Sequence, residues 1–153
     1  MKYCYILPLL LLVICSRPAL AQSSEEEFVK SAINKLFEGM KKGDSAMVKA
    51  VFADNALLQT ISTPAQKAPT LGTAALQQFL HAVGTPHTDV WDERIRFDKI
   101  MIDGALASVW TPYQFYLGDR FSHCGVNSFQ LMKFADGWKI IYLVDTRRKD
   151  GCL

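Results

Sequence analysis

The chain lacks a strong excess of basic residues and a cluster of metal-binding side chains. Its 153 residues carry 17 Lys and Arg against 15 Asp and Glu, so the formal net charge is only +2. The basic residues do not cluster beyond pairs, which gives no support to nucleic-acid binding through a basic face. The chain has three histidines and four cysteines, with no Cys-x-x-Cys pair or Cys/His cluster. The sequence therefore predicts no metal site.

Several cofactor-binding and catalytic motifs are also missing. The sequence contains no Gly-x-Gly-x-x-Gly, no P-loop, no His-Glu-x-x-His and no Gly-x-Ser-x-Gly. These absences argue against a nucleotide cofactor and a standard hydrolase, and we expect no cofactor. What the chain does have is apolar content: 50% of its residues are hydrophobic. That content and the length predict one packed domain.

The first 21 residues have the pattern of a secretory signal peptide. Lys2 is followed by an apolar run over residues 5–15 and by Ala-Leu-Ala at 19–21, the usual order of such signals. The apolar run is shorter than the roughly 20 residues that cross a bilayer as a helix. We expect cleavage after Ala21 and export of a single domain, 22–153, to the periplasm or the medium. An uncleaved anchor is the alternative; the mature protein is not expected to span a membrane.

Cys124 and Cys152 are the two cysteines of the expected mature chain. An even pair in an oxidising compartment predicts a disulfide. In the simplest strand register Cys124 lies opposite Lys149, three residues before Cys152. The alternative is a buried Cys124 with a loose Cys152 at a frayed end.

Helical spacing dominates the first half of the mature chain. Apolar residues recur every three or four positions over 25–42, which predicts an amphipathic helix. The same reasoning predicts a short helix that Asp44 caps and that includes Val51 and Phe52. Further along, the pattern predicts a strand at 56–61, a loop at 62–71 with room for a short strand, and a helix at 73–83.

Strand-like alternation takes over after residue 90. It predicts four strands, at 91–102, 105–117, 120–134 and 138–148,. Three Asp/Gly dipeptides at the junctions favour tight hairpin turns: Asp103-Gly104, Gly118-Asp119 and Asp136-Gly137,. Helices followed by a run of strands predict an α+β fold, with helices packed on one face of a curved antiparallel meander.

Hairpins without bulges would decide which side chains share a face of this sheet. Under that assumption one face carries the larger aromatic rings and a small polar group: Trp110, Gln114, His123, Asn127, Phe129 and Tyr142. Asp145 would then lie on the opposite face from His123. One bulge would exchange part of these sets, because a slip of one residue inverts every side chain.

The order of elements and several local motifs resemble the nuclear transport factor 2-like superfamily, which includes ketosteroid isomerase, scytalone dehydratase and the SnoaL-like polyketide cyclases. The motifs lie at residues 40–44, 51–56, 71–73 and 136–140, and the resemblance runs from about Phe28 to Arg148. Residues 110–125 and Thr146-Arg147 look most like secreted bacterial proteins of the lumazine-binding-like group. The resemblance implies a cone-shaped fold, a mainly apolar pocket between the concave sheet and the helices, and a possible homodimer.

His123 is the best acid/base candidate, because it is the only histidine of the strand half and its ordinary pKa lies near neutrality,. Asp145 or Tyr113 could assist it, although Asp145 meets His123 only if a strand bulges. The candidate ligand-binding residues are Trp110, Gln114, Phe115, Asn127, Phe129 and Tyr142. Ordinary core packing is the alternative role of each ring.

Three functions remain open at this point. The leading prediction is an exported protein that binds a small apolar or heteroaromatic molecule. The first alternative is a cofactor-free isomerase, dehydratase or cyclase with His123 as general acid/base. The second is a homodimeric interaction module without a ligand. The chain departs from the enzymes it resembles: it has one suitable histidine where scytalone dehydratase uses two, and the Tyr and Asp set of ketosteroid isomerase does not map onto it.

Overall fold

The computed structural model describes residues 18–63 and 67–152. The predicted signal peptide therefore lies mainly outside the described residues, and its last residues, 18–21, form the start of the first helix. Within the described ranges, no helix is both long and apolar enough to cross a bilayer.

Three helices form within residues 18–63 and 67–152, and their ends follow local signals. They are α1 (Pro18–Lys42), α2 (Ser45–Ala50) and α3 (Leu76–Gly84). Gly43, with φ of +67°, follows the last residue of α1, the position where a left-handed residue commonly ends a helix. Asp44 caps α2 by accepting the backbone N–H of Met47 at 2.9 Å, as predicted. The helix is shorter than predicted, because Val51 ends it and Phe52 opens a strand.

In the part of the chain that the structure describes, seven strands make one curved, mixed sheet. They are β1 (Phe52–Ser62), β2 (Thr70–Ala74), β3 (Trp91–Ile95), β4 (Lys99–Asp103), β5 (Leu106–Leu117), β6 (Arg120–Phe134) and β7 (Gly137–Arg147). Their order is β2-β1-β7-β6-β5-β3, with β4 also pairing with β5. β4 to β7 form the predicted antiparallel meander, but β1 runs parallel to β7. The predicted strand 91–102 is two strands, and the predicted loop 62–71 contains the start of β2.

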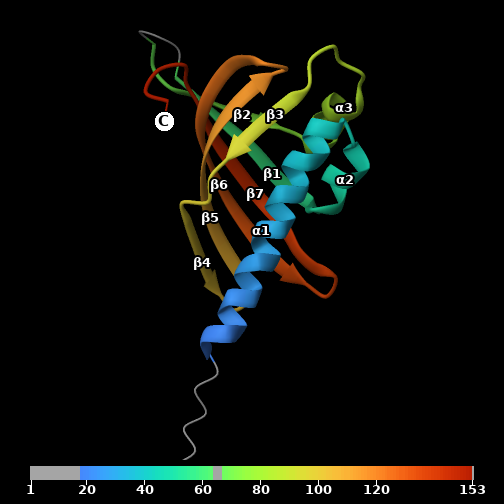
Figure 1. The fold of residues 1–153 in the computed structure, drawn as a ribbon, viewed down its shortest axis with the longest axis vertical. Helices are drawn as coiled ribbons and strands as arrows, with labels where there is room; N and C mark the ends of the chain where they lie inside the picture. The colour runs from blue at the N-terminus through green and yellow to red at the C-terminus, as the bar shows by residue number, and fades with distance from the viewer. Residues whose placement is uncertain (1–17, 64–66, 153) are drawn as a thin grey trace, which may run out of the picture.

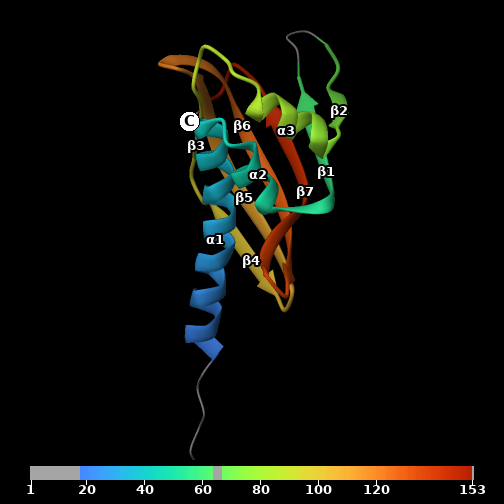
Figure 2. The same cartoon turned by 90° about the vertical axis from the view of Figure 1, so that its right-hand side faces the viewer.

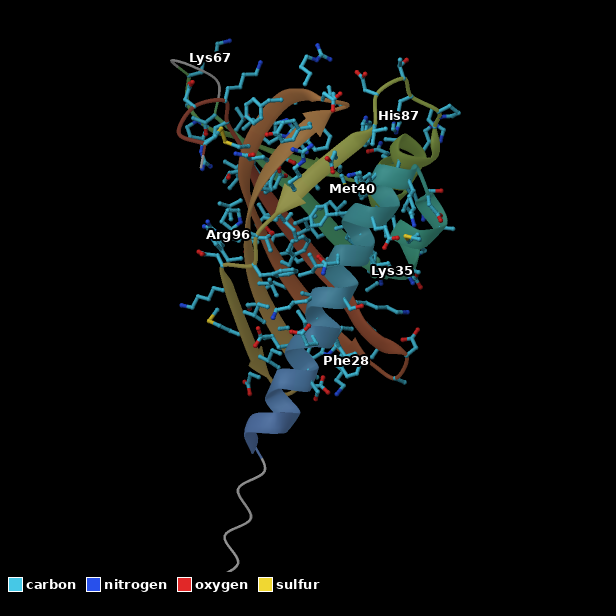
Figure 3. The ribbon with its side chains drawn as sticks, viewed as in Figure 1. Phe28, Lys35, Met40, Lys67, His87 and Arg96 are labelled. Carbon is cyan, nitrogen blue, oxygen red and sulfur yellow. A yellow bond between two sulfur atoms is a disulfide. The ribbon has the colours of Figure 1, made fainter. Side chains whose placement is uncertain are left out.

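All three helices cover the same face of the sheet, as the two perpendicular views show (Figures 1 and 2). α1 crosses the long strands, while α2 and α3 pack near one end. Side chains fill the layer between α1 and the sheet (Figure 3). The hydrophobic core lies there, and its fully buried members include Val29, Ile33, Leu36, Val48, Val83, Phe129, Leu131 and Ile140.

Two β-bulges set which side chains face the helices. Phe115 pairs with His123 but Tyr116 pairs with Phe121, so Ser122 is an extra residue in β6. The second bulge is in β7, where the register with β6 skips Ile141. Each extra residue shifts the pairing by one position. Beyond it, the residues that face the helices are the opposite set from those predicted without a bulge.

These bulges correct the predicted faces. Because of the bulge in β6, the odd-numbered residues of β5 face the helices instead of the even-numbered ones, and Trp110 and Gln114 lie on the outer face. Trp110 is 46% exposed, beside β4 residues and Ser128. Past the bulge in β7, Tyr142 turns outward and donates its hydroxyl to Gln59 Oε1 at 2.7 Å. None of these three lines the cavity between sheet and helices.

Candidate functional site

A cavity of about 510 Å³ lies between the sheet and the helices α1 and α3, where the resemblance placed it. α1 contributes Met40 (labelled in Figure 3) and α3 contributes Phe79. The walls are mainly apolar, and include Leu36, Phe37, Met40, Leu58, Phe79, Trp91, Phe115, Leu117 and Leu143. A second set of lining residues is polar: Thr60, Glu93, Tyr113, His123, Asn127, Asp145 and Arg147.

Asp145 is the centre of this polar set. It is 8% exposed and accepts hydrogen bonds from Thr60 Oγ1 at 2.5 Å, from the Tyr113 hydroxyl at 3.1 Å and from Arg147 Nε at 2.9 Å. The bulge in β7 places it there, directly opposite Asn127 of β6. Three donors, one of them a cation, thus hold the two oxygens of this carboxyl group. Asp145 is therefore a carboxylate whose acceptors are already engaged.

Glu93 is the second carboxyl of the cavity, and its surroundings differ. It lies on β3, and its Oε1 accepts a hydrogen bond from Asn127 Nδ2 at 2.8 Å. Among the described residues, no cation lies within ion-pair distance of it. Burial raises the pKa of Glu93 to about 7, with a further increase from the Asp145 charge; the Asn127 bond and Arg147 oppose the shift. Glu93 therefore populates both its protonated and its ionised form near neutral pH.

Tyr113 and His123, two further titratable residues of the cavity, stay uncharged at neutral pH. Burial, followed by the charges of Asp145 and Glu93, raises the pKa of the Tyr113 hydroxyl well above its usual range. Burial and the Arg147 cation lower the pKa of His123, while Asp145 opposes them. His123 Nδ1 lies 3.0 Å from Ser122 Oγ, and its ring packs against Phe115 with centroids 4.9 Å apart.

The pKa of Glu93 makes stability depend on pH. The folded state binds this proton more tightly than the unfolded chain, whose Glu pKa is near 4.5. The stability that the proton contributes is fully present below that value and is lost as pH rises through about 7. We expect Glu93→Gln to abolish this loss. As pH rises from about 4 to about 8, the free energy of unfolding of Glu93→Gln should increase relative to that of wild type by at most about 3 kcal/mol. Urea unfolding of both proteins across this range measures it, and parallel pH profiles would contradict it.

The structure brings together five of the nine predicted site residues. Tyr113, His123 and Asp145 all line the cavity, as do Phe115 and Asn127. His123 and Asp145 share the cavity because the bulges exist, but His123 bonds to Ser122 rather than to Asp145. Phe129 lies on the helix-facing side, yet it is fully buried in the core against Phe37, with ring centroids 6.2 Å apart.

Glu93, Arg147 and Thr60 belong to the site but were not among the predicted site residues. Glu93 had a signal in the sequence: it stands between Trp91 and Ile95 at strand spacing, which puts its carboxyl on their apolar side,. Arg147 could be recognised as a cavity residue only if the bulge in β7 were known, because simple alternation does not place its side chain in the cavity.

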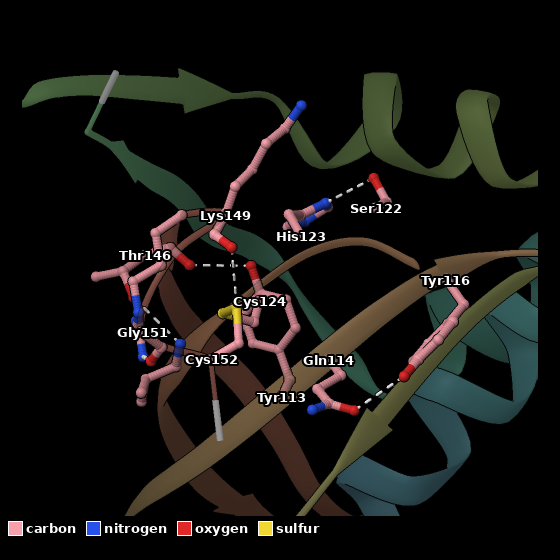
Figure 4. Close-up of a disulfide and its surroundings, with 12 residues drawn as sticks. Tyr113, Gln114, Tyr116, Ser122, His123, Cys124, Thr146, Lys149, Gly151 and Cys152 are labelled. Carbon is pink, nitrogen blue, oxygen red and sulfur yellow. Dashed lines mark hydrogen bonds between the residues drawn. A yellow bond between two sulfur atoms is a disulfide. The ribbon is translucent and has the colours of Figure 1, made fainter. Parts of the chain in front are cut away.

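Two interactions hold the end of β7 beside this site: a disulfide and a hydrogen bond from Tyr113. Cys124 and Cys152, the predicted pair, are joined with their Cα atoms 5.8 Å apart. Tyr113 also donates its hydroxyl to the carbonyl oxygen of Thr146 at 2.9 Å, next to the disulfide (Figure 4). The carboxyl-terminal segment thus helps to hold Tyr113 in place. Over the residues that the structure describes, no three His, Cys, Asp or Glu side chains form a group that could hold a metal ion.

A family model described as "Putative lumazine-binding" matches residues 24–144. The chain belongs to this lumazine-binding family. The match spans both layers of the fold and most residues of the cavity. No curated protein matches the chain.

Solved structures confirm the nuclear transport factor 2-like fold. An NTF2-like protein of unknown function from Shewanella baltica is 17% identical, with a TM-score of 0.65 over 84% of this chain and 97% of its own. An NTF2-like protein with a cystatin-like fold from Novosphingobium aromaticivorans is 11% identical, with a TM-score of 0.69 over 86% of each chain. A "putative dehydratase" of the NTF2-like family from Streptomyces avermitilis is 15% identical, with a TM-score of 0.61 over 82% of this chain and 97% of its own. Identities this low establish the fold alone.

Proposed function

We propose that the protein binds a small, flat, largely apolar molecule of the heteroaromatic class in the cavity between the sheet and the helices α1 and α3. The cavity itself carries this proposal: about 510 Å³, with mainly apolar walls and a few polar groups. Sites of roughly 300–1,000 Å³ with this composition commonly hold small molecules. The family's name supports the same class, since lumazine is a heteroaromatic ring system.

The apolar and the polar lining residues would contact different parts of the ligand. Trp91, Phe115 and Leu143 would contact the faces of the bound rings, because aromatic and aliphatic surfaces pack well on flat apolar ligands,. Asn127, Glu93 and Arg147 would bond polar atoms on the rim of the ligand. Export through the signal peptide at residues 1–21 is part of the proposal and rests on the sequence pattern. The homodimer stays a prediction from the resemblance.

Two aromatic residues of the same strand test the site. Phe115 lines the cavity, whereas Trp110 lies on the outer face of β5. With lumazine as the probe in titration calorimetry, we expect Phe115→Ala to weaken binding by about tenfold or more, which corresponds to about 1.4 kcal/mol of lost aromatic contact.

Trp110→Ala is the matched control and should bind lumazine as wild type does. Native mass spectrometry of protein purified from its own cell envelope should also reveal a co-purified ligand. If wild type neither binds lumazine nor carries a ligand, or if Trp110→Ala weakens binding while Phe115→Ala does not, the proposed site is incorrect.

A cofactor-free isomerase, dehydratase or cyclase is the second candidate. The observation that favours it is a neutral imidazole in the cavity: burial lowers the pKa of His123, so that the ring can accept a proton at neutral pH,. The dehydratase name of the Streptomyces avermitilis neighbour points the same way. His123→Gln should then abolish turnover while the protein still folds.

A further inference from the structure

We propose that Glu93, rather than His123, is the proton-transfer residue of the cavity, and that it acts on an acidic C–H of a flat, largely apolar substrate. This inference rests on the proposed function, because it requires a small molecule bound in the same cavity. Its substrate class is a carbonyl compound or heteroaromatic ring whose C–H is acidified by the neighbouring group. The reaction class is a cofactor-free isomerisation or elimination.

The first argument is the contrast between the two carboxyls. Asp145 accepts hydrogen bonds from Thr60, Tyr113 and Arg147, so its oxygens are engaged and its charge is compensated. Glu93 is bonded by a neutral amide, Asn127 Nδ2, at 2.8 Å. Of two neighbouring carboxyls, the one held by three donors is fixed in place, and the one held by a single neutral donor is free to exchange a proton. Glu93 takes the exchanging role.

The second argument is position. Glu93 lies between Trp91 and Ile95 at strand spacing, and Trp91 lines the apolar part of the cavity with Phe115 and Leu143. A carboxylate beside apolar walls is less solvated than one in water and is therefore a stronger base. Asn127 fixes the orientation of the carboxyl through Oε1. The base is thus oriented by a neighbour, as a catalytic base requires.

The groups that face Glu93 favour this chemistry at neutral pH. β7 supplies the Asp145 anion and the Arg147 cation, β5 supplies Tyr113, and β6 supplies His123. Burial is the main cause of the raised pKa of Glu93, about 7, so both its ionised and its protonated form are populated. Arg147 is the cation of the cavity, and it would stabilise negative charge that develops on the substrate.

The step balances without a cofactor. The C–H bond breaks, its electron pair stays on the substrate and delocalises into the adjacent carbonyl or ring, and the proton moves to the Glu93 carboxylate. Returning this proton to another carbon gives an isomer. When the substrate carries a leaving group, the electron pair expels it instead and the proton passes to water. Nothing is oxidised or reduced.

5-Nitrobenzisoxazole is a suitable probe, because it is flat, heteroaromatic and acidified at one ring carbon. Removal of that proton makes a nitrile, breaks the N–O bond and releases a coloured phenolate. We expect wild type to catalyse this elimination, and Glu93→Gln to lower kcat by about 10²–10⁴-fold, the usual contribution of a general base. KM should change little. Glu38→Gln, which removes an exposed carboxylate of α1, is the matched control and should retain the wild-type rate.

The pH profile and one more variant separate Glu93 from His123. With Glu93 as the base, kcat/KM should rise through about pH 7, whereas a histidine of lowered pKa would give a midpoint below 6.5. The midpoint near pH 7 should remain in His123→Gln, whatever its rate. Equal rates in wild type and Glu93→Gln, or a loss in His123→Gln alone, would overturn the assignment. Lumazine binding to Glu93→Gln, measured separately, distinguishes failure of the base from failure of the binding site.

Discussion

Replacing Gly125 by alanine is expected to destabilise the protein by about 4 kcal/mol or more, at the upper end of single-residue effects. A Cβ added at Gly125 would lie 1.7 Å from the carbonyl oxygen of Thr146 and 2.8 Å from Tyr113 Cε1. The first contact is with backbone that is fixed in β7, so a rotamer change cannot relieve it. The strands would have to move apart, and packing and hydrogen bonds would be lost together.

The same change should disturb the polar end of the cavity. Gly125 pairs with Tyr113, and Tyr113 bonds both the carbonyl of Thr146 and the Asp145 carboxylate. The absence of a side chain at Gly125 is what allows Thr146 to come within reach of the Tyr113 hydroxyl. A protein that tolerates alanine at this position should therefore bind lumazine more weakly than wild type.

Gly72→Ala is the control for this prediction. The nearest atom to an added Cβ at Gly72 is Thr60 O, at 3.8 Å, an ordinary contact. Its backbone φ is not in the left-handed region, so we expect a change within about 0.5 kcal/mol. Chemical unfolding of the two variants measures the difference. A Gly125→Ala protein as stable as Gly72→Ala would mean that β6 and β7 do not approach each other in this way.

The fold could be predicted because its signals are local. Apolar spacing indicated α1, Asp44 indicated the start of α2, and Gly118-Asp119 indicated the turn between β5 and β6. Each signal depends on a few neighbouring residues, and their order matched a known superfamily. Signals of this kind do not depend on how the strands curve.

The faces of the sheet could not be predicted, because two bulges decide them. Ser122 and Ile141, the extra residues, are neither glycine nor proline and carry no turn signal. The strong curvature of the sheet around the helices, a tertiary property, provides the reason for a bulge in these long strands. One residue in each strand was enough to move Trp110 to the outside and to bring Asp145 into the cavity.

Breaking the disulfide is expected to have the second large effect. Cys124 and Cys152 are 28 residues apart in the sequence, and closing a loop of this length stabilises the folded state by about 3.5 kcal/mol in the chain-entropy model. Cys152→Ser should lose this amount in chemical unfolding. We choose Cys152 because Cys124 is only 1% exposed, and a serine there would add the cost of burying a hydroxyl.

Loss of the disulfide should also have a local effect on the end of β7. Cys124 and Arg148 exchange two backbone hydrogen bonds of 3.0 Å, directly beyond Asp145 and Arg147 in the chain. Loss of the disulfide should therefore loosen the end of β7 first, which native-state hydrogen exchange at Arg148 would detect. Reductant should lower the stability of wild type to that of Cys152→Ser and leave the variant unchanged. If reductant does not affect wild type, or if Cys124 and Cys152 titrate as free thiols after unfolding without reductant, the disulfide is not what holds this end of the chain.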